Sequence, residues 1–125
     1  MIVFRLRTSK KTMDIFEDIQ KSTYIKPFAL SKLAIALSLK ESVDGLRFNT
    51  DSNGIDLNKQ TITGKFDVMY KCLIEQHCGH HLRDEDYFPK YIKAHIDRGA
   101  IILHNEFRYA KDLIPYLAGL EGKSI

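Results

Sequence analysis

Apolar and basic side chains alternate over residues 2–7, at the start of the chain. Ile2, Phe4 and Leu6 fall on one face, and Arg5 and Arg7 fall on the other. This period of two predicts a short strand with an apolar face and a basic face. Apolar residues then recur at helical spacing up to about residue 22, after two residues that suit a helix N-cap. The N-cap candidates are Thr8 and Ser9, and the apolar stripe consists of Met13, Ile15, Phe16 and Ile19.

A second helix is predicted over residues 27–40, because Pro27 suits the first turn of a helix and no further breaker follows. The segment reads PFALSKLAIALSLK and is apolar around most of its circumference. A helix of this kind is buried, and here we expect other subunits to contribute to its burial. The sequence therefore predicts an oligomer whose core contains Leu30, Leu33 and Leu37.

Residues 42–64 are more polar than the preceding segment and indicate a polar loop or a small hairpin. Asn53-Gly54 is a strong turn signal between two short extended stretches, residues 46–48 and residues 55–57. The N-terminal strand must pair with this region or with the same strand of another copy, because a lone strand leaves its backbone unsatisfied. The second possibility is the ribbon-helix-helix arrangement, in which paired strands contact DNA.

The second half of the chain predicts further helices separated by glycine and proline. One covers residues 66–78 and stops at Gly79, and another covers residues 86–98 and stops at Gly99. A short apolar helix over 100–103 and a last helix over 109–117, interrupted near Pro115, complete the pattern. The expected fold class is mainly α with one short N-terminal strand, a ribbon-helix-helix-like start. We expect a small single domain over residues 1–125 that oligomerises.

Charge is distributed unevenly along the chain. Residues 1–32 hold seven Lys and Arg against three acids, and the remaining residues hold twelve against thirteen. A basic opening quarter is typical of an edge that faces a polyanion, although a solvated surface has the same composition. No apolar run approaches the roughly 18 residues that span a bilayer, and no signal peptide is recognisable, so a cytoplasmic protein without a membrane partner is expected.

Metal-ligating residue types are concentrated in CLIEQHCGHH, residues 72–81. Zinc prefers four Cys or His ligands in tetrahedral geometry, but Cys72 and Cys78 are six residues apart and Gly79 separates His77 from His81. We find no catalytic or phosphate-loop motif. The sequence therefore favours a protein without catalytic residues, metal or cofactor, and a metal-dependent enzyme that uses residues 77–81 stays open as an alternative.

The basic residues of the opening quarter are the remaining candidates for function. Arg5 and Arg7 share a strand face, and Lys10 and Lys11 begin a helix whose free N–H groups already favour phosphate. Side chains of this kind grip the DNA backbone and carry little sequence information. The expected DNA contacts are Arg5, Arg7, Lys10, Lys11, Lys21 and Lys26.

Five features of the chain, taken in order, form a recognisable series: RLRTSKKT, PFALSKLAIALSL, the Phe48-Asn49 pair, TITGKFDVMY and AHIDRGAIIL. Together they resemble the DndE family of the bacterial DNA phosphorothioation (DNA sulfur modification) system. The last block is the most specific, through its His-x-x-Arg-Gly core at His95, Arg98 and Gly99. The chain departs from the family pattern at residues 23–26, where many relatives have glycine before the proline.

The resemblance implies a small, mainly helical homotetramer that binds double-stranded DNA, preferentially nicked duplex, through surface lysines. It also implies three partner proteins, a cysteine desulfurase, an ATP-pyrophosphatase-like sulfur-transfer protein and an SMC-like ATPase, and no established catalytic residues. The leading hypothesis is a non-catalytic DNA-binding subunit of this machinery. A ribbon-helix-helix transcriptional repressor, a metal-dependent enzyme and a scaffold that contacts only proteins are the alternatives.

Overall fold

The computed structural model describes the backbone of residues 5–124 and the side chains of residues 5–111. The first half of the predicted N-terminal strand, residues 2–4, lies outside this range. The described chain is mostly helical, with one pair of short strands near its N-terminus, as the sequence predicts.

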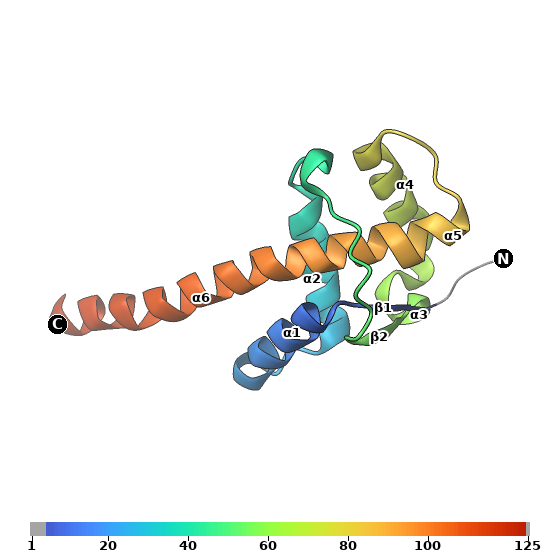
Figure 1. The fold of residues 1–125 in the computed structure, drawn as a ribbon. Helices are drawn as coiled ribbons and strands as arrows, with labels where there is room; N and C mark the ends of the chain where they lie inside the picture. Colours follow the sequence, from blue (N-terminus) through green and yellow to red (C-terminus); the bar gives the residue numbers. More distant parts are fainter. Residues whose placement is uncertain (1–4, 125) are drawn as a thin grey trace.

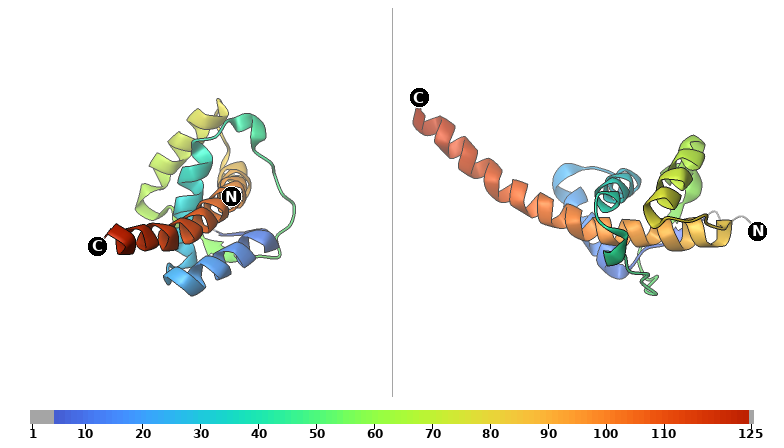
Figure 2. Two further views of the ribbon diagram at one scale, coloured as in Figure 1. Left: turned by 90° about the vertical axis from the view of Figure 1, so that its left-hand side faces the viewer. Right: turned by 90° about the horizontal axis from the view of Figure 1, so that it is seen from above.

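A long C-terminal helix, α6 (Lys93–Ser124), forms the axis of the fold (Figure 1). Helix α2 (Pro27–Leu39) crosses it, and α1 (Lys10–Thr23) and α4 (Asp67–Cys78) lie on either side. Two further views show the same arrangement, with the C-terminal part of α6 projecting away from the other elements (Figure 2). The shorter elements are η1 (Val43–Gly45), α3 (Lys59–Ile62) and η2 (Gly64–Phe66).

The N-terminal strand finds its pairing partner within the same chain. Strand β1 (Arg5–Arg7) pairs antiparallel with β2 (Asp56–Asn58), with Leu6 opposite Leu57. Both leucines are buried, so the predicted apolar face is confirmed and packs on the core. Residues 46–48 form no strand, so residues 42–55 are a loop with one 3₁₀ turn rather than a hairpin of their own.

Local signals determine where the first two helices begin and end. Ser9 caps α1 by accepting a hydrogen bond from the backbone N–H of Thr12, and Pro27 occupies the first turn of α2. Helix α1 ends at Tyr24, whose φ of 62° is left-handed, a conformation that usually selects glycine. The predicted boundaries of both helices are confirmed to within about one residue.

The predicted stop at Gly99 is wrong. The segments predicted at 86–98, 100–103 and 109–117 are parts of one continuous helical rod. This rod consists of α5 (Asp84–Asp86), the π-helical turn η3 (Tyr87–Ile92) and α6 (Lys93–Ser124). Pro89 lies in η3, where its missing N–H and its clash with the carbonyl four residues earlier account for the widened turn.

Gly99 is required for packing rather than for a turn. A Cβ atom on Gly99 would overlap the carbonyl oxygen of Ala34 on α2. The glycine therefore lets the backbones of α2 and α6 touch where they cross. Around this crossing the core is filled by large apolar side chains. Its fully buried members include Phe16, Leu30, Ile35, Ile62, Ile74, Tyr87, Phe88, Ile92 and Ile96. Within the described residues, no helix has the length and apolarity needed to cross a membrane.

Candidate nucleic-acid interface

The two arginines of β1 point to solvent on the face opposite Leu6. Arg5 contacts Asp56 on the neighbouring strand, with 3.1 Å between Nη1 and Oδ2. Both side chains are exposed, so this ion pair is weak and the arginine stays available to a stronger anion. Arg7 is also exposed.

The N-terminus of α1 is less open to phosphate than the sequence indicates. The backbone N–H of Lys10 donates to Oδ2 of Asp51 at 3.1 Å, so a carboxylate already occupies part of the predicted anion site. Backbone hydrogen bonds from Asn53 and Lys10 hold the pKa of Asp51 below its ordinary value. The Lys10 ammonium contacts Asp14 at 2.8 Å, and this hydrogen bond raises its pKa. Lys10 is therefore partly neutralised.

Lys21 and Lys26 lie at the other end of α1 and are exposed. Lys21 follows Lys10 and Lys11 by about three turns of α1, which at 1.5 Å per residue separates them by about 15 Å, and Lys26 lies beyond the end of the helix. The predicted contacts therefore do not form one compact patch. They mark the two ends of a helix, and this spacing suits separate phosphates along a duplex.

The structure adds one cation that the sequence reasoning missed. Arg47, in the loop before β2, lines the same 220 Å³ surface cavity as Lys11. Both side chains are exposed, and no carboxylate in the described part of the chain forms an ion pair with either. Arg47 belongs to no recognisable motif. It follows Lys11 by 36 positions, so the sequence does not indicate that both residues line one cavity.

A buried polar junction fixes the start of α1 against α6. Asp97 accepts hydrogen bonds from the Ser9 backbone N–H at 3.1 Å and from the Thr12 hydroxyl at 2.6 Å. Its other oxygen pairs with Lys93 at 2.8 Å, and Lys93 also donates to the carbonyl of Asn49. All four buried side chains thus have partners, which a buried charge requires. The junction holds α1, α6 and the loop that carries Arg47 in a fixed relation.

The cysteine and histidine cluster does not assemble into a metal site. Cys72 is exposed, and His81 is engaged by Glu75, with 2.7 Å between Nδ1 and Oε2. Among the residues that the structure describes, no three His, Cys, Asp or Glu side chains come together in a way that could hold a metal ion. The acids of residues 84–86 begin a helix and pair with Lys71, Arg83 and Lys90. The metal-dependent alternative therefore has no ligand set in this part of the chain.

A family model described as "DNA sulphur modification protein DndE" matches residues 5–111. The chain belongs to the DndE family. The crystal structure of DndE from Escherichia coli B7A, described as involved in DNA phosphorothioation modification, is similar with a TM-score of 0.62 and 20% identity. A DndE mutant described as involved in DNA phosphorothioation is similar with a TM-score of 0.63 and 21% identity. Each match covers 82% of this chain and 99% of the other, and a comparison with curated proteins finds no match.

The most specific block of the DndE resemblance has a structural role. Arg98 donates to the carbonyls of Ser38 at 2.7 Å and Ser42 at 2.6 Å, and its Nε donates to the Ser38 hydroxyl. Ser38 lies in the last turn of α2 and Ser42 lies just beyond it, at a helix end where backbone acceptors are short of helical donors. Arg98 therefore caps α2 from α6, and Gly99 seats the same two helices against each other. The His-x-x-Arg-Gly core is a helix clamp in this DndE-family chain.

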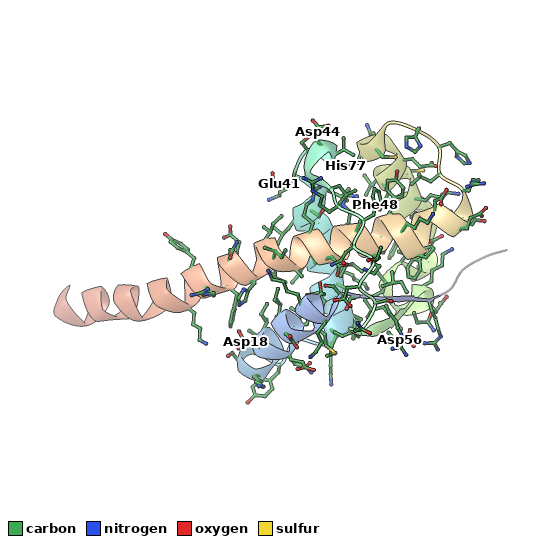
Figure 3. The ribbon with its side chains drawn as sticks, viewed as in Figure 1. Asp18, Glu41, Asp44, Phe48, Asp56 and His77 are labelled. Carbon is green, nitrogen blue, oxygen red and sulfur yellow. The ribbon has the colours of Figure 1, made fainter. Side chains whose placement is uncertain are left out.

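The histidine of this DndE block belongs to a buried chain of hydrogen bonds. His95 Nδ1 lies 2.8 Å from the Ser38 hydroxyl, and burial, together with repulsion from His77 and Arg98, lowers its pKa to about 3. His77 Nε2 lies 2.7 Å from the carbonyl oxygen of Glu41, which only accepts, so this nitrogen carries a proton (Figure 3). The two rings meet edge to face, and their remaining nitrogens are buried without a partner among the described residues. The edge-to-face contact of the two rings, with 4.9 Å between their centroids, packs α4 against the clamp.

The predicted oligomer residues of this DndE-family chain have different environments. Leu30 is 1% exposed and belongs to the protomer's own core, whereas Leu33 is 46% exposed and Leu37 is half-buried. Met69 and Leu73 of α4 are also exposed, and a cavity of about 400 Å³ lies between α2 and α4. The role of the three leucines in an oligomer stays a prediction, with Leu33 the most accessible of them.

Proposed function

We propose that this chain is a non-catalytic DNA-binding subunit of the bacterial DNA phosphorothioation machinery. Membership of the DndE family supports the system, and the placement of cations supports the activity. The observation that best supports DNA binding is a set of exposed cations around α1 that form no ion pair with a described carboxylate. The set consists of Arg7, Lys11, Lys21, Lys26 and Arg47.

These cations suit the DNA backbone better than the bases. They lie on separate elements and at both ends of a helix, and none belongs to a row of side chains that would enter one groove. Lys and Arg arranged in this way neutralise phosphates without reading sequence. Arg5 and Lys10 would join them by exchanging weak, exposed carboxylate partners for phosphate.

Oligomerisation would multiply these contacts. A homotetramer, joined through the exposed apolar side chains of α2, would repeat each cation four times and make binding strong at low salt. In this arrangement the protein holds double-stranded DNA, including nicked duplex. Its partners, the sulfur-transfer protein, the SMC-like ATPase and the cysteine desulfurase, would carry out the chemistry in the cytoplasm.

A salt titration of DNA binding tests the proposal. Fluorescence anisotropy would compare one labelled duplex in intact and nicked form, an unrelated duplex and a single strand, with oligomer mass from sedimentation. We expect binding that ignores sequence, prefers the nick and weakens steeply from low to moderate salt. No binding at low salt would refute a DNA-binding role. A specificity ratio of about 10³ at physiological salt would instead identify a repressor.

A further inference from the structure

The cavity beside Lys11 brings together cations from three separate elements. Lys11 comes from the first turn of α1, Arg47 from the loop before β2, and Arg98 from α6. The cavity has a volume of about 220 Å³, large enough to admit a small anionic group. None of these three side chains forms an ion pair with a carboxylate in the described part of the chain.

The carboxylate and the hydroxyl groups that line the cavity already have ion-pair or hydrogen-bond partners within the protein. Asp97 is the one carboxylate of the described lining, and Lys93 neutralises it from outside the cavity at 2.8 Å. The hydroxyls of Ser9 and Thr12 contact each other at 3.1 Å, and Thr12 also donates to Asp97. With Asp97 paired to Lys93, the remaining charged side chains of the lining are the three cations.

We propose that this cavity receives one phosphate of a DNA backbone, with Lys11 and Arg47 as its direct ligands. Arg98 supplies a fixed background charge, because its Nη1 and Nη2 donate to the carbonyls of Ser42 and Ser38. Arg47 offers the planar donor fork that matches phosphate oxygens, and Lys11 adds a point charge. The inference rests on the proposed DNA-binding function and assigns two ligands to a single phosphate.

The salt dependence of binding distinguishes one shared phosphate from two separate ones. The magnitude of the slope of log K against log salt falls by about 0.9 for each duplex phosphate that loses its cation. Lys11→Gln and Arg47→Gln should each weaken duplex binding and reduce this slope. For each protomer that contacts the duplex, the double variant should reduce it by about 0.9 in total if both residues serve one phosphate, against about 1.8 if they serve two, so the slope is compared per bound protomer from the measured stoichiometry.

Lys65→Gln is the matched control, because Lys65 is an exposed cation on η2, outside the proposed contacts. Its slope should equal that of the wild-type chain, and unfolding midpoints should show that every variant is folded. Arg47→Gln binding as tightly as Lys65→Gln would overturn the inference, and so would a double variant whose slope falls by about 1.8 for each protomer that contacts the duplex. Either result leaves the proposed function intact, whereas a wild-type chain that binds no duplex removes the function itself.

Discussion

Acidification should destabilise this protein through one buried side chain, His95. Its imidazole is fully enclosed, and its pKa is lowered to about 3, first by burial and then by His77 and Arg98. In the unfolded chain the same group titrates near about 6.5. Because the folded pKa is the lower one, the unfolded state takes up the proton first. Stability is therefore complete above about pH 6.5 and is lost as the pH falls toward 3.

The expected loss is large enough to measure. Each pKa unit corresponds to about 1.4 kcal/mol, so lowering the pH from about 7.5 to about 5 should cost about 2 kcal/mol through His95. Domains of this size have unfolding free energies of about 5–15 kcal/mol. Carboxylates with a lowered pKa, such as Asp51 and Asp86, lose their contribution only below about pH 4, so they do not obscure this window.

Urea unfolding of the wild-type chain and of His95→Gln at both pH values is the assay. The variant should be less stable at neutral pH, but its stability should fall by about 2 kcal/mol less on acidification. If acidification lowered the unfolding free energy of the wild-type chain and of His95→Gln by the same amount, the reasoning would be refuted. An NMR titration of the wild-type chain gives the same answer without a variant, since the His95 ring should stay neutral at pH 5.

Three further substitutions test other parts of the structure. Tyr24→Gly should raise the unfolding free energy by about 1 kcal/mol, because the left-handed φ of 62° strains an exposed side chain that packs little; an unchanged urea midpoint would contradict this. Gly99→Ala should lower the melting temperature by the equivalent of about 1–3 kcal/mol, because its Cβ would overlap the backbone of α2. Gly45→Ala is the control and should be tolerated, because its Cβ would meet one atom at 3.5 Å. If both alanine variants lowered the melting temperature equally, Gly99 would not be specifically required for the packing of α2 on α6. Leu33→Glu should reduce the mass seen by sedimentation without unfolding the protomer, and an unchanged mass would exclude this face of α2 from the oligomer.

The elements that the sequence predicts correctly are those bounded by local signals. The alternation around Leu6, the cap at Ser9, Pro27 and Gly79 each act within a few residues, so their effect can be read without the rest of the fold. Family resemblance then supplied the system that no local pattern could indicate. The predicted DNA contacts beyond this resemblance rest on charge alone.

The errors concern residues whose role depends on distant parts of the chain. Gly99 looks like a helix stop, but its partner is Ala34, sixty-five positions earlier. Asp51 occupies the N-terminus of α1 from a loop some forty positions away, and Arg47 lines the same cavity as Lys11 from that loop. Sequence spacing contains no information about these approaches, because tertiary packing produces them.

The polar junction at Asp97 has a consequence for the order of events during translation. Lys11 and Arg47 are synthesised early, yet the groups that hold their surroundings in place, Lys93 and Asp97, lie on the last helix. A nascent chain that has not yet released residues 93–98 from the ribosome lacks both the junction and the cap on α2. The proposed phosphate site would therefore be completed only near the end of synthesis.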